Sequence, residues 1–203
     1  EMYVAATTAI VWPAFLTVGF LAVPITVLLF GENWREAGEI LPYILGGAAI
    51  VAALPQPEQI LTPHGAVRRL ALVRLVQLTV VLSLATVGAM HSLKLVAMLN
   101  VPSALAFSLT SFWAIHLLMG TTLKRLLPSY AKAALLSGMS AAPALFLFLE
   151  YESSPPTAAV LLGLACAASI WTGGIFLLRH PLGSELLLVL KPLRKRLAPS
   201  NRL

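Results

Sequence analysis

The sequence predicts an all-α integral membrane protein, a bundle of six transmembrane helices, and three observations lead to this prediction. Apolar residue types make up 59% of the 203 residues and charged types only 11%, whereas soluble domains have about 45–50% and about 25%. A soluble protein with so little charge would expose large apolar patches, which soluble monomers avoid. Six apolar runs are continuous and do not alternate with period two, so they are read as helices and not as barrel strands.

The six expected spans follow one another with short connections between them. A helix needs about 20 residues to cross a hydrocarbon core of roughly 30 Å. The spans are expected at Ala5–Phe30, Ile40–Leu61, Leu70–Met90, Leu95–Met119, Ala131–Leu149 and Thr157–Leu178. Residues 1–180 would therefore form the six-helix transmembrane bundle, and residues 181–203 a basic interfacial or cytoplasmic tail.

The basic residues orient these spans. Of the 14 Lys and Arg residues, all but Arg35 and Lys94 lie in the tail or in and beside the connections after the second and fourth spans. Cytoplasmic segments of membrane proteins carry an excess of Lys and Arg. We therefore expect a multi-pass protein of the inner (cytoplasmic) membrane with both ends in the cytoplasm. The acidic loop Glu32–Glu39 and the turn at 150–156 would lie outside.

The first outer connection has a residue pattern with a physical explanation. Phe30 and Trp34 would lie at the membrane interface, where aromatic rings are enriched. Gly31 is expected to take the left-handed conformation that ends a helix. Glu32 or Asn33 is expected to cap the next helical turn. The same features also suit an outer loop of any other membrane protein.

The stretch "VPITVLLFGENWREAGEILPYI" resembles the polysaccharide flippases of the MOP (multidrug/oligosaccharidyl-lipid/polysaccharide) superfamily, the Wzx-like group. In that pattern an apolar span with an internal proline ends in Phe-Gly, and a Trp and a small residue precede the next span. The matching positions are Pro24, Phe30, Gly31, Trp34 and Ala37.

Two further stretches extend the resemblance over most of the chain. "QILTPHGAVRRLALVRL" resembles the family's next connection, with Leu61, Gly65, Arg68 and Arg69 at the matching positions, and "RHPLGSELLLVLKPLRKRL" resembles family tails. The resemblance implies a transporter of two pseudo-symmetric halves, of which this chain would be the C-terminal half. The implied activity is the flipping or export of a polysaccharide or lipid-linked oligosaccharide, in a cavity shared with the missing N-terminal half.

One alternative comes from another functional class: a six-span structural or assembly subunit of a cell-envelope polysaccharide or secretion complex, with no transport of its own. The chain begins within an apolar run without a basic leader or cleavage site, so we expect it to be part of a longer chain. An enzyme is not expected, because Asp is absent and no metal-ligand spacing, nucleophile elbow or phosphate loop is present. No cofactor and no nucleic-acid partner are expected.

Ionisable residues inside a membrane span are candidates for function, because their burial is costly. Glu58 and Gln59 lie near the cytoplasmic end of the second span, where Pro55 and Pro57 remove backbone donors and interrupt the helix. Broken helices at membrane depth are tolerated where they face protein or water. Glu58 is therefore expected either to line a wet vestibule or to be a hydrated interface residue.

Four further residues complete the candidate translocation path. Arg74 and Gln77 are three residues apart on one helical face, and Arg74 either binds a lipid diphosphate or extends to the headgroups. Asn100 and His116 bracket the fourth span, and His116 is either a titrating group or a hydrogen-bonded structural one. No metal site is expected.

The tail predicts an amphipathic helix on the anionic inner leaflet. Leu186, Leu190, Leu193 and Leu197 share one helical face. The membrane-surface residues beside them are Lys191, Arg194, Lys195 and Arg196.

The charge distribution generates a prediction about topology. A reporter fused after Arg202 should be active in the cytoplasm, and a reporter inserted at Ser153 should be active outside, because cytoplasmic segments retain the positive charge. Activity of paired cytoplasmic and periplasmic reporters measures this directly. The reverse result would exclude the assigned orientation.

Overall fold

The computed structural model describes residues 2–151 and 155–177, and this part of the chain is helical apart from short connections. Its elements are α1 Met2–Phe20, α2 Ala22–Phe30, the 3₁₀ turn η1 Glu32–Trp34, α3 Arg35–Ala52, α4 Pro57–Leu61, α5 Val67–Ala89, α6 Leu93–Met119, α7 Leu123–Tyr151 and α8 Thr157–Leu177. Six helical stretches are long and apolar enough to cross a membrane. The all-α prediction is confirmed, and the helices are consistent with a multi-pass membrane protein. The predicted tail helix lies outside the described residues.

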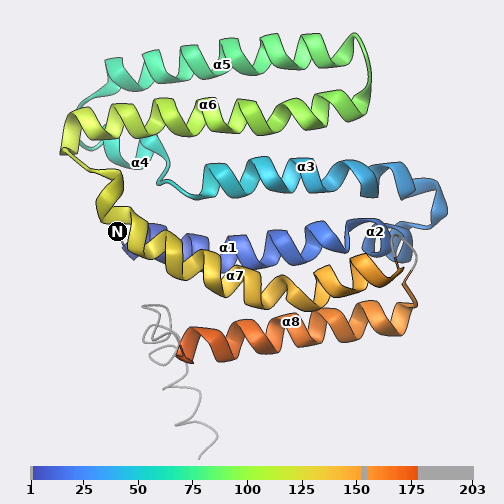
Figure 1. Cartoon of the computed structure of the whole chain (residues 1–203). Coiled ribbons are helices and arrows are strands. Elements are labelled where there is room, and N and C mark those ends of the chain that lie inside the picture. Colours follow the sequence, from blue (N-terminus) through green and yellow to red (C-terminus); the bar gives the residue numbers. More distant parts are fainter. Residues whose placement is uncertain (1, 152–154, 178–203) are drawn as a thin grey trace, which may run out of the picture.

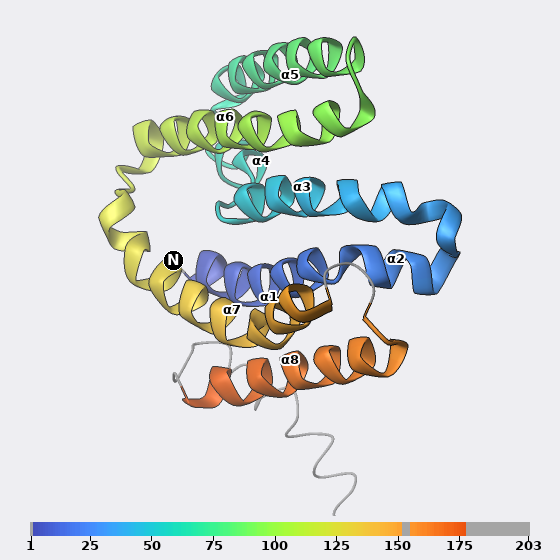
Figure 2. The ribbon, with the colours of Figure 1, turned by 45° about the vertical axis from the view of Figure 1, so that its right-hand side comes forward.

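The long helices lie side by side in one layer, in the order α5, α6, α3, α1, α7, α8 (Figure 1). The same order is visible after a rotation of 45° (Figure 2). Helices α5 and α6 form a hairpin, as do α7 and α8, whereas the neighbours α1 and α7 are far apart in sequence. The described helices therefore form a more open assembly than the closed bundle that a six-span pattern suggests.

Helix α3 joins the two sides of this layer. It packs against α6 on one side and against α1 and α2 on the other. Within the described residues, α4, α5 and α6 make no helix-to-helix contact with α1, α2, α7 or α8, and the consecutive helices α6 and α7 do not touch. The position of α4–α6 relative to the other helices thus depends on α3.

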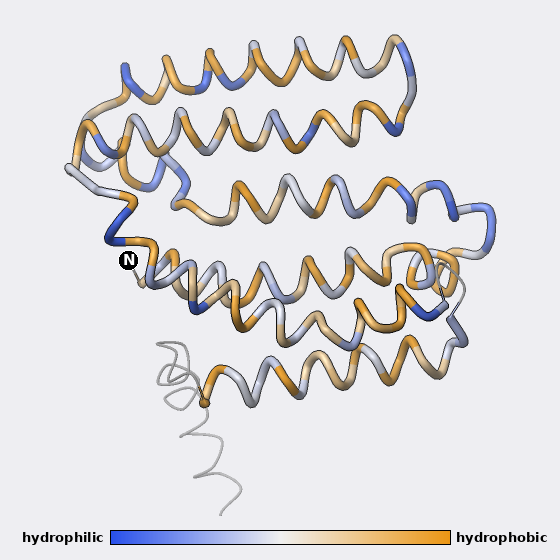
Figure 3. The backbone as a smooth tube through the Cα atoms, viewed as in Figure 1, coloured by the Kyte–Doolittle hydropathy of each residue, from blue (hydrophilic) through white to orange (hydrophobic). Residues whose placement is uncertain are grey.

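Hydrophilic residues gather at the two ends of the layer (Figure 3). One end holds η1 and the start of α3, and the opposite end holds α4 and the starts of α5 and α7. The basic residues Arg68, Arg69, Lys124 and Arg125 belong to the second end. Successive connections thus alternate between the two ends, as the predicted topology requires. Which of the two ends faces the cytoplasm stays a prediction.

The first predicted span is broken into two helices. Helix α1 ends at Phe20 and α2 begins at Ala22. Pro24 has no N–H to donate to the carbonyl of Phe20 four residues earlier, which explains the interruption at this point. The expectation of one continuous helix from Ala5 to Phe30 is therefore wrong.

The second predicted span breaks after α3, and side chains satisfy the carbonyls that the break exposes. Pro55 and Pro57 cannot donate to the carbonyls four residues before them. The last turn of α3 also tightens, since the Ala53 N–H bonds the Ile50 carbonyl at 3.2 Å. Donors from α1, α6 and α7 reach this segment: Trp12 Nε1 to the Ala49 carbonyl at 2.9 Å, Ser108 Oγ to the Ile50 carbonyl at 3.2 Å, and Tyr130 OH to the Ala53 carbonyl at 2.7 Å.

The connection between α2 and α3 differs from its predicted form. Gly31 has φ 91° and ψ 173°, so its φ is positive as expected, but its ψ lies outside the left-handed helical region. Neither Glu32 nor Asn33 caps a helix, because Trp34 precedes α3 without a side-chain cap. Glu32 instead forms an ion pair with Arg35. The expected acidic loop is mostly helical, since η1 and the first turn of α3 occupy it.

Helix α7 begins earlier than predicted. The expected span started at Ala131, whereas α7 starts at Leu123 and includes Lys124, Arg125 and Pro128. Lys and Arg have good helix propensity. Their charge therefore excludes them from the apolar run but does not exclude them from the helix.

Close helix packing at one glycine generates a prediction about stability. A Cβ atom at Gly38 would lie 2.7 Å from the Val23 Cα atom of α2. Gly38→Ala should therefore destabilise the protein by about 1–3 kcal/mol, the usual cost of overpacking. Gly138→Ala is the matched control, since a Cβ there meets nothing within 4 Å. Thermal unfolding of the detergent-solubilised protein measures both, and equal melting temperatures would contradict the close approach.

Candidate functional site

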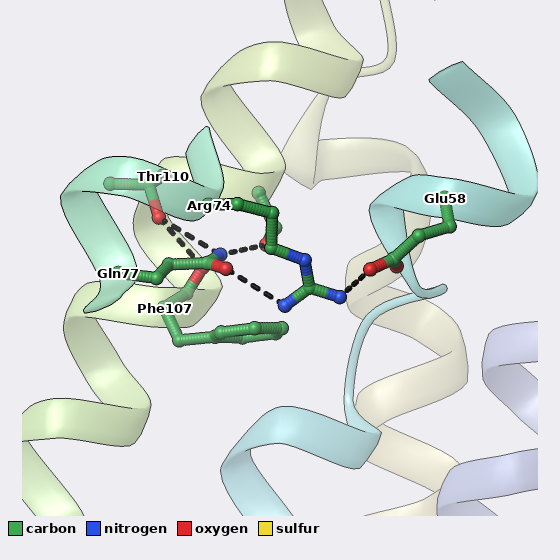
Figure 4. Close-up of polar contacts among 6 residues, drawn as sticks. Glu58, Arg74, Gln77, Phe107 and Thr110 are labelled. Atoms are coloured by element: carbon green, nitrogen blue, oxygen red, sulfur yellow. Dashed lines mark hydrogen bonds and ion pairs between the residues drawn. The ribbon is translucent and has the colours of Figure 1, made fainter. Parts of the chain in front are cut away.

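Polar side chains from three helices meet at the end of the layer that holds α4 (Figure 4). Glu58 comes from α4, Arg74 and Gln77 come from α5, and Thr110 and Ser111 come from α6. We call these five residues and Phe107 the Arg74 cluster. Three of the predicted path residues, Glu58, Arg74 and Gln77, are thus brought together.

Helix α4 is anchored by apolar contacts and presents its acidic residue to α5. Leu61 is fully buried in a cluster with Val73 of α5 and Ala114 of α6. Pro57, also buried, begins the helix, where its missing N–H costs no helical hydrogen bond. Glu58, one position later in the helix, lies on the side that Arg74 approaches.

Arg74 has partners on three sides. Its Nη2 forms an ion pair with Glu58 Oε1, and its Nη1 donates to Gln77 Oε1 at 3.0 Å. The guanidinium carbon lies 5.4 Å from the centre of the Phe107 ring, within cation–π range. The Glu58 and Arg74 side chains are 39% and 44% exposed, so where water reaches this pair it contributes about 0–1 kcal/mol.

Gln77 is the buried centre of the cluster, with 5% of its surface exposed. Its Nε2 lies 3.1 Å from Ser111 Oγ, 3.4 Å from Thr110 Oγ1 and 3.4 Å from the Phe107 carbonyl. Its Oε1 accepts from Arg74. A buried amide is stable only when its hydrogen bonds are made, and here both ends of the amide have partners. Gln77 therefore links the cation on α5 to the backbone of α6.

The cluster can hold an anion at a fixed place. A guanidinium has five N–H donors in a planar fork, and the contacts within the described residues involve Nη1 and Nη2. Phe107 and Gln77 hold the guanidinium plane, and nearly half of the side chain is exposed. Planar forks of this kind bind carboxylates and phosphates with two parallel hydrogen bonds.

The other predicted path residues do not join the cluster. Gln59 is exposed. Asn100 Nδ2 lies 3.4 Å from the Ile44 carbonyl of α3. His116 Nδ1 lies 2.7 Å from the Thr121 carbonyl, and its ring stacks on Phe112. Asn100 and His116 thus each lie within hydrogen-bond distance of a backbone carbonyl, and their part in a translocation path stays a prediction.

The motif residues of the first connection lie at the opposite end of the layer. The rings of Phe30 and Trp34 contact each other, with centroids 5.6 Å apart, on either side of Gly31, and Pro24 lies in α2. Lys191, Arg194, Lys195 and Arg196 lie outside the described residues.

Three members of the cluster were not predicted from the sequence: Phe107, Thr110 and Ser111. Their spacing of three and four residues places them on one helical face. Asn100 and Ser103 continue that face toward the start of α6. A row of polar side chains on an otherwise apolar span was therefore a usable signal.

The comparisons leave the family open. No protein-family model, no curated protein and no solved structure matches the chain. Within residues 2–151 and 155–177, no group of three or more His, Cys or Glu side chains is arranged to hold a metal ion.

The buried amide generates the next prediction. Gln77→Leu should destabilise the protein by about 1–3 kcal/mol, because it removes one partner of Arg74 and the shared partner of the α6 polar groups at once. Thr79→Val is the control, since the exposed Thr79 hydroxyl bonds only the Leu75 carbonyl of its own helix. Thermal unfolding in detergent compares the two. Equal losses would show that Gln77 does not link α5 to α6.

Proposed function

We propose that this chain is the C-terminal half of a transporter that moves a polysaccharide or lipid-linked oligosaccharide across the cytoplasmic membrane by alternating access. The observation that carries the proposal is the placement of Arg74. It lies seven residues after the start of α5 at Val67, about 10 Å along a helix axis, in a helix apolar enough to span a membrane. A cation at that depth is costly and marks a functional position by default.

The chemistry of the expected substrate suits this cation. A lipid-linked glycan carries its phosphate groups between an apolar chain and a polar sugar. Arg74 would hold the phosphate near the basic end of the layer, the lipid chain would stay in the bilayer, and the glycan would enter a polar space. The sequence pattern around Pro24, Phe30, Gly31 and Trp34, which resembles the Wzx-like flippases, supports the same substrate class.

The open layer supports a two-half architecture. Large apolar side chains are exposed along its helices, including Leu75, Leu109, Phe146 and Leu162. Lipid can cover part of this surface, and a second half of similar size can cover the rest. In transporters built from repeats, substrate sites lie at the interface between the halves.

One observation favours the alternative of a non-transporting structural or assembly subunit. Glu58 and Gln77 already bind Arg74. The cluster could therefore serve only to hold α4, α5 and α6 together, without binding any ligand. The two proposals differ in what lies upstream of Glu1. Further in-frame spans would support the transporter, and a start at Met2 would support the subunit.

The transporter proposal is tested by substitution of Arg74 in the complete protein. Arg74→Gln should lower surface polysaccharide at least tenfold while membrane protein level is unchanged, and Arg74→Lys should retain part of the export, since a charge remains without the planar fork. Surface polysaccharide is measured in a strain lacking its own flippase. Arg69→Gln, which removes an exposed charge from the same helix, is the matched control. Full export by Arg74→Gln would remove Arg74 from the transport path.

A further inference from the structure

Glu58 lies where an anionic ligand of Arg74 would bind. We propose that Glu58 is an internal competitor of the ligand: its carboxylate and the phosphate group of a lipid-linked substrate bind the Arg74 guanidinium in turn, and binding of the phosphate weakens the attachment of α4 to α5. This inference rests on the proposed function, because it assumes that an anionic lipid-linked substrate reaches Arg74. It adds a regulatory contact that the substrate must displace.

The geometry of the guanidinium brings the two anions into competition at Nη2. Its two planar forks are the Nε–Nη2 edge and the Nη1–Nη2 edge, and both include Nη2. Glu58 Oε1 occupies Nη2, and Gln77 Oε1 occupies Nη1. Nη2 has one N–H on each edge, and Glu58 Oε1 occupies one of them. A phosphate on the edge that Glu58 uses must displace the carboxylate, and a phosphate on the other edge shares Nη2 with the carboxylate. Once bound, the phosphate repels the carboxylate, since two like charges would face each other across one cation.

Gln77 and Phe107 keep the guanidinium in place during this exchange. They contact Arg74 from α5 and α6, which form one hairpin. Glu58 is the partner that comes from a separate short helix. The exchange therefore leaves the cation fixed and changes only the attachment of α4.

Helix α4 is short and has few other contacts that hold it against α5 and α6. It has five residues, with Pro55 and Pro57 before or at its start and Gly65 at φ 69° after its end. Two kinds of contact hold α4: the buried side chains of Pro57 and Leu61, and the ion pair between Glu58 and Arg74. Helix α4 follows α3 after a short connection. A change in the attachment of α4 would therefore change the support of α3, the helix that joins the two sides of the layer.

Thermodynamic linkage makes the proposal quantitative. If Glu58 lowers the affinity for phosphate by some factor, phosphate must weaken the attachment of α4 by the same factor. Neutralising Glu58 should therefore have two effects: tighter phosphate binding, and an α4 that is loose before any ligand is added.

The binding test uses the full 203-residue chain in phosphatidylcholine nanodiscs, with a polyprenyl diphosphate as the lipid-borne probe and inorganic pyrophosphate as the soluble one. Glu58→Gln should lower the Kd of the lipid-borne probe at least fivefold, and Arg74→Gln should abolish specific binding with or without Glu58→Gln. Glu36→Gln, an exposed acidic residue at the opposite end of the layer, is the matched control and should leave the Kd unchanged. Competition by pyrophosphate would show that the anion alone suffices, and its failure to compete would show that the lipid chain is required.

The second measurement follows α4 directly. A spin label at the exposed position 59, introduced as Gln59→Cys with Cys166→Ser, should become more mobile when the lipid-borne probe is added. With Glu58→Gln present, the label should be mobile from the start and should not respond further.

The outcomes separate this inference from the proposed function. Loss of binding in Arg74→Gln with an unchanged or higher Kd in Glu58→Gln would overturn the competition and leave Arg74 as an anion site. Equal binding by wild type and Arg74→Gln, or no binding by wild type and Glu58→Gln, would overturn both the competition and the anion site. Whether the complete protein exports polysaccharide is decided independently by the surface assay.

Discussion

The break between α3 and α4 is the constraint on which the rest of the structure depends. In a bilayer, each backbone group without a partner costs several kcal/mol, and two prolines at positions 55 and 57 leave carbonyls of the preceding turns without their usual donors. Trp12, Ser108 and Tyr130 supply donors from three other helices. The hydrogen bonds that make the break tolerable therefore also attach α1, α6 and α7 to α3. One local defect in a helix thus helps to assemble the whole layer.

The sequence was sufficient to predict six apolar spans and their helical class. Continuous apolar runs predict spanning helices because lipid permits little else, and Gly31 was correctly expected at a positive φ. Helix ends were less predictable, since apolar character and helical conformation end at different residues. Lys124 and Arg125 show this, because they lie outside the predicted apolar run but inside α7. The break at Leu21 was missed because a proline inside a membrane helix is often tolerated.

The order of helices in the layer and the composition of the site were beyond sequence reasoning for a common reason. Both depend on contacts between residues far apart in sequence, such as Gln77 with Ser111. The spacing of Arg74 and Gln77 predicted that they share a face, and the structure pairs them. Nothing in the spacing indicated that Glu58, on a different helix, is the carboxylate partner of Arg74. Asn100 and His116 looked equally polar in sequence, yet each bonds a nearby carbonyl and stays apart from the cluster.

The pairing of α1 with α7 and α8 has a consequence for biosynthesis. The carbonyl of Ala9 accepts a hydrogen bond from the indole of Trp171, 162 residues later. At roughly 5–20 residues per second, a ribosome needs about 8–30 s to make the intervening chain. Helix α1 lacks both α7 and α8 until residues 123–151 are made, and it lacks a complete α8 for the whole of that time. Lipid, the insertion machinery or another segment has to shield α1 in the meantime, so α1 is made well before all of its native surroundings are present.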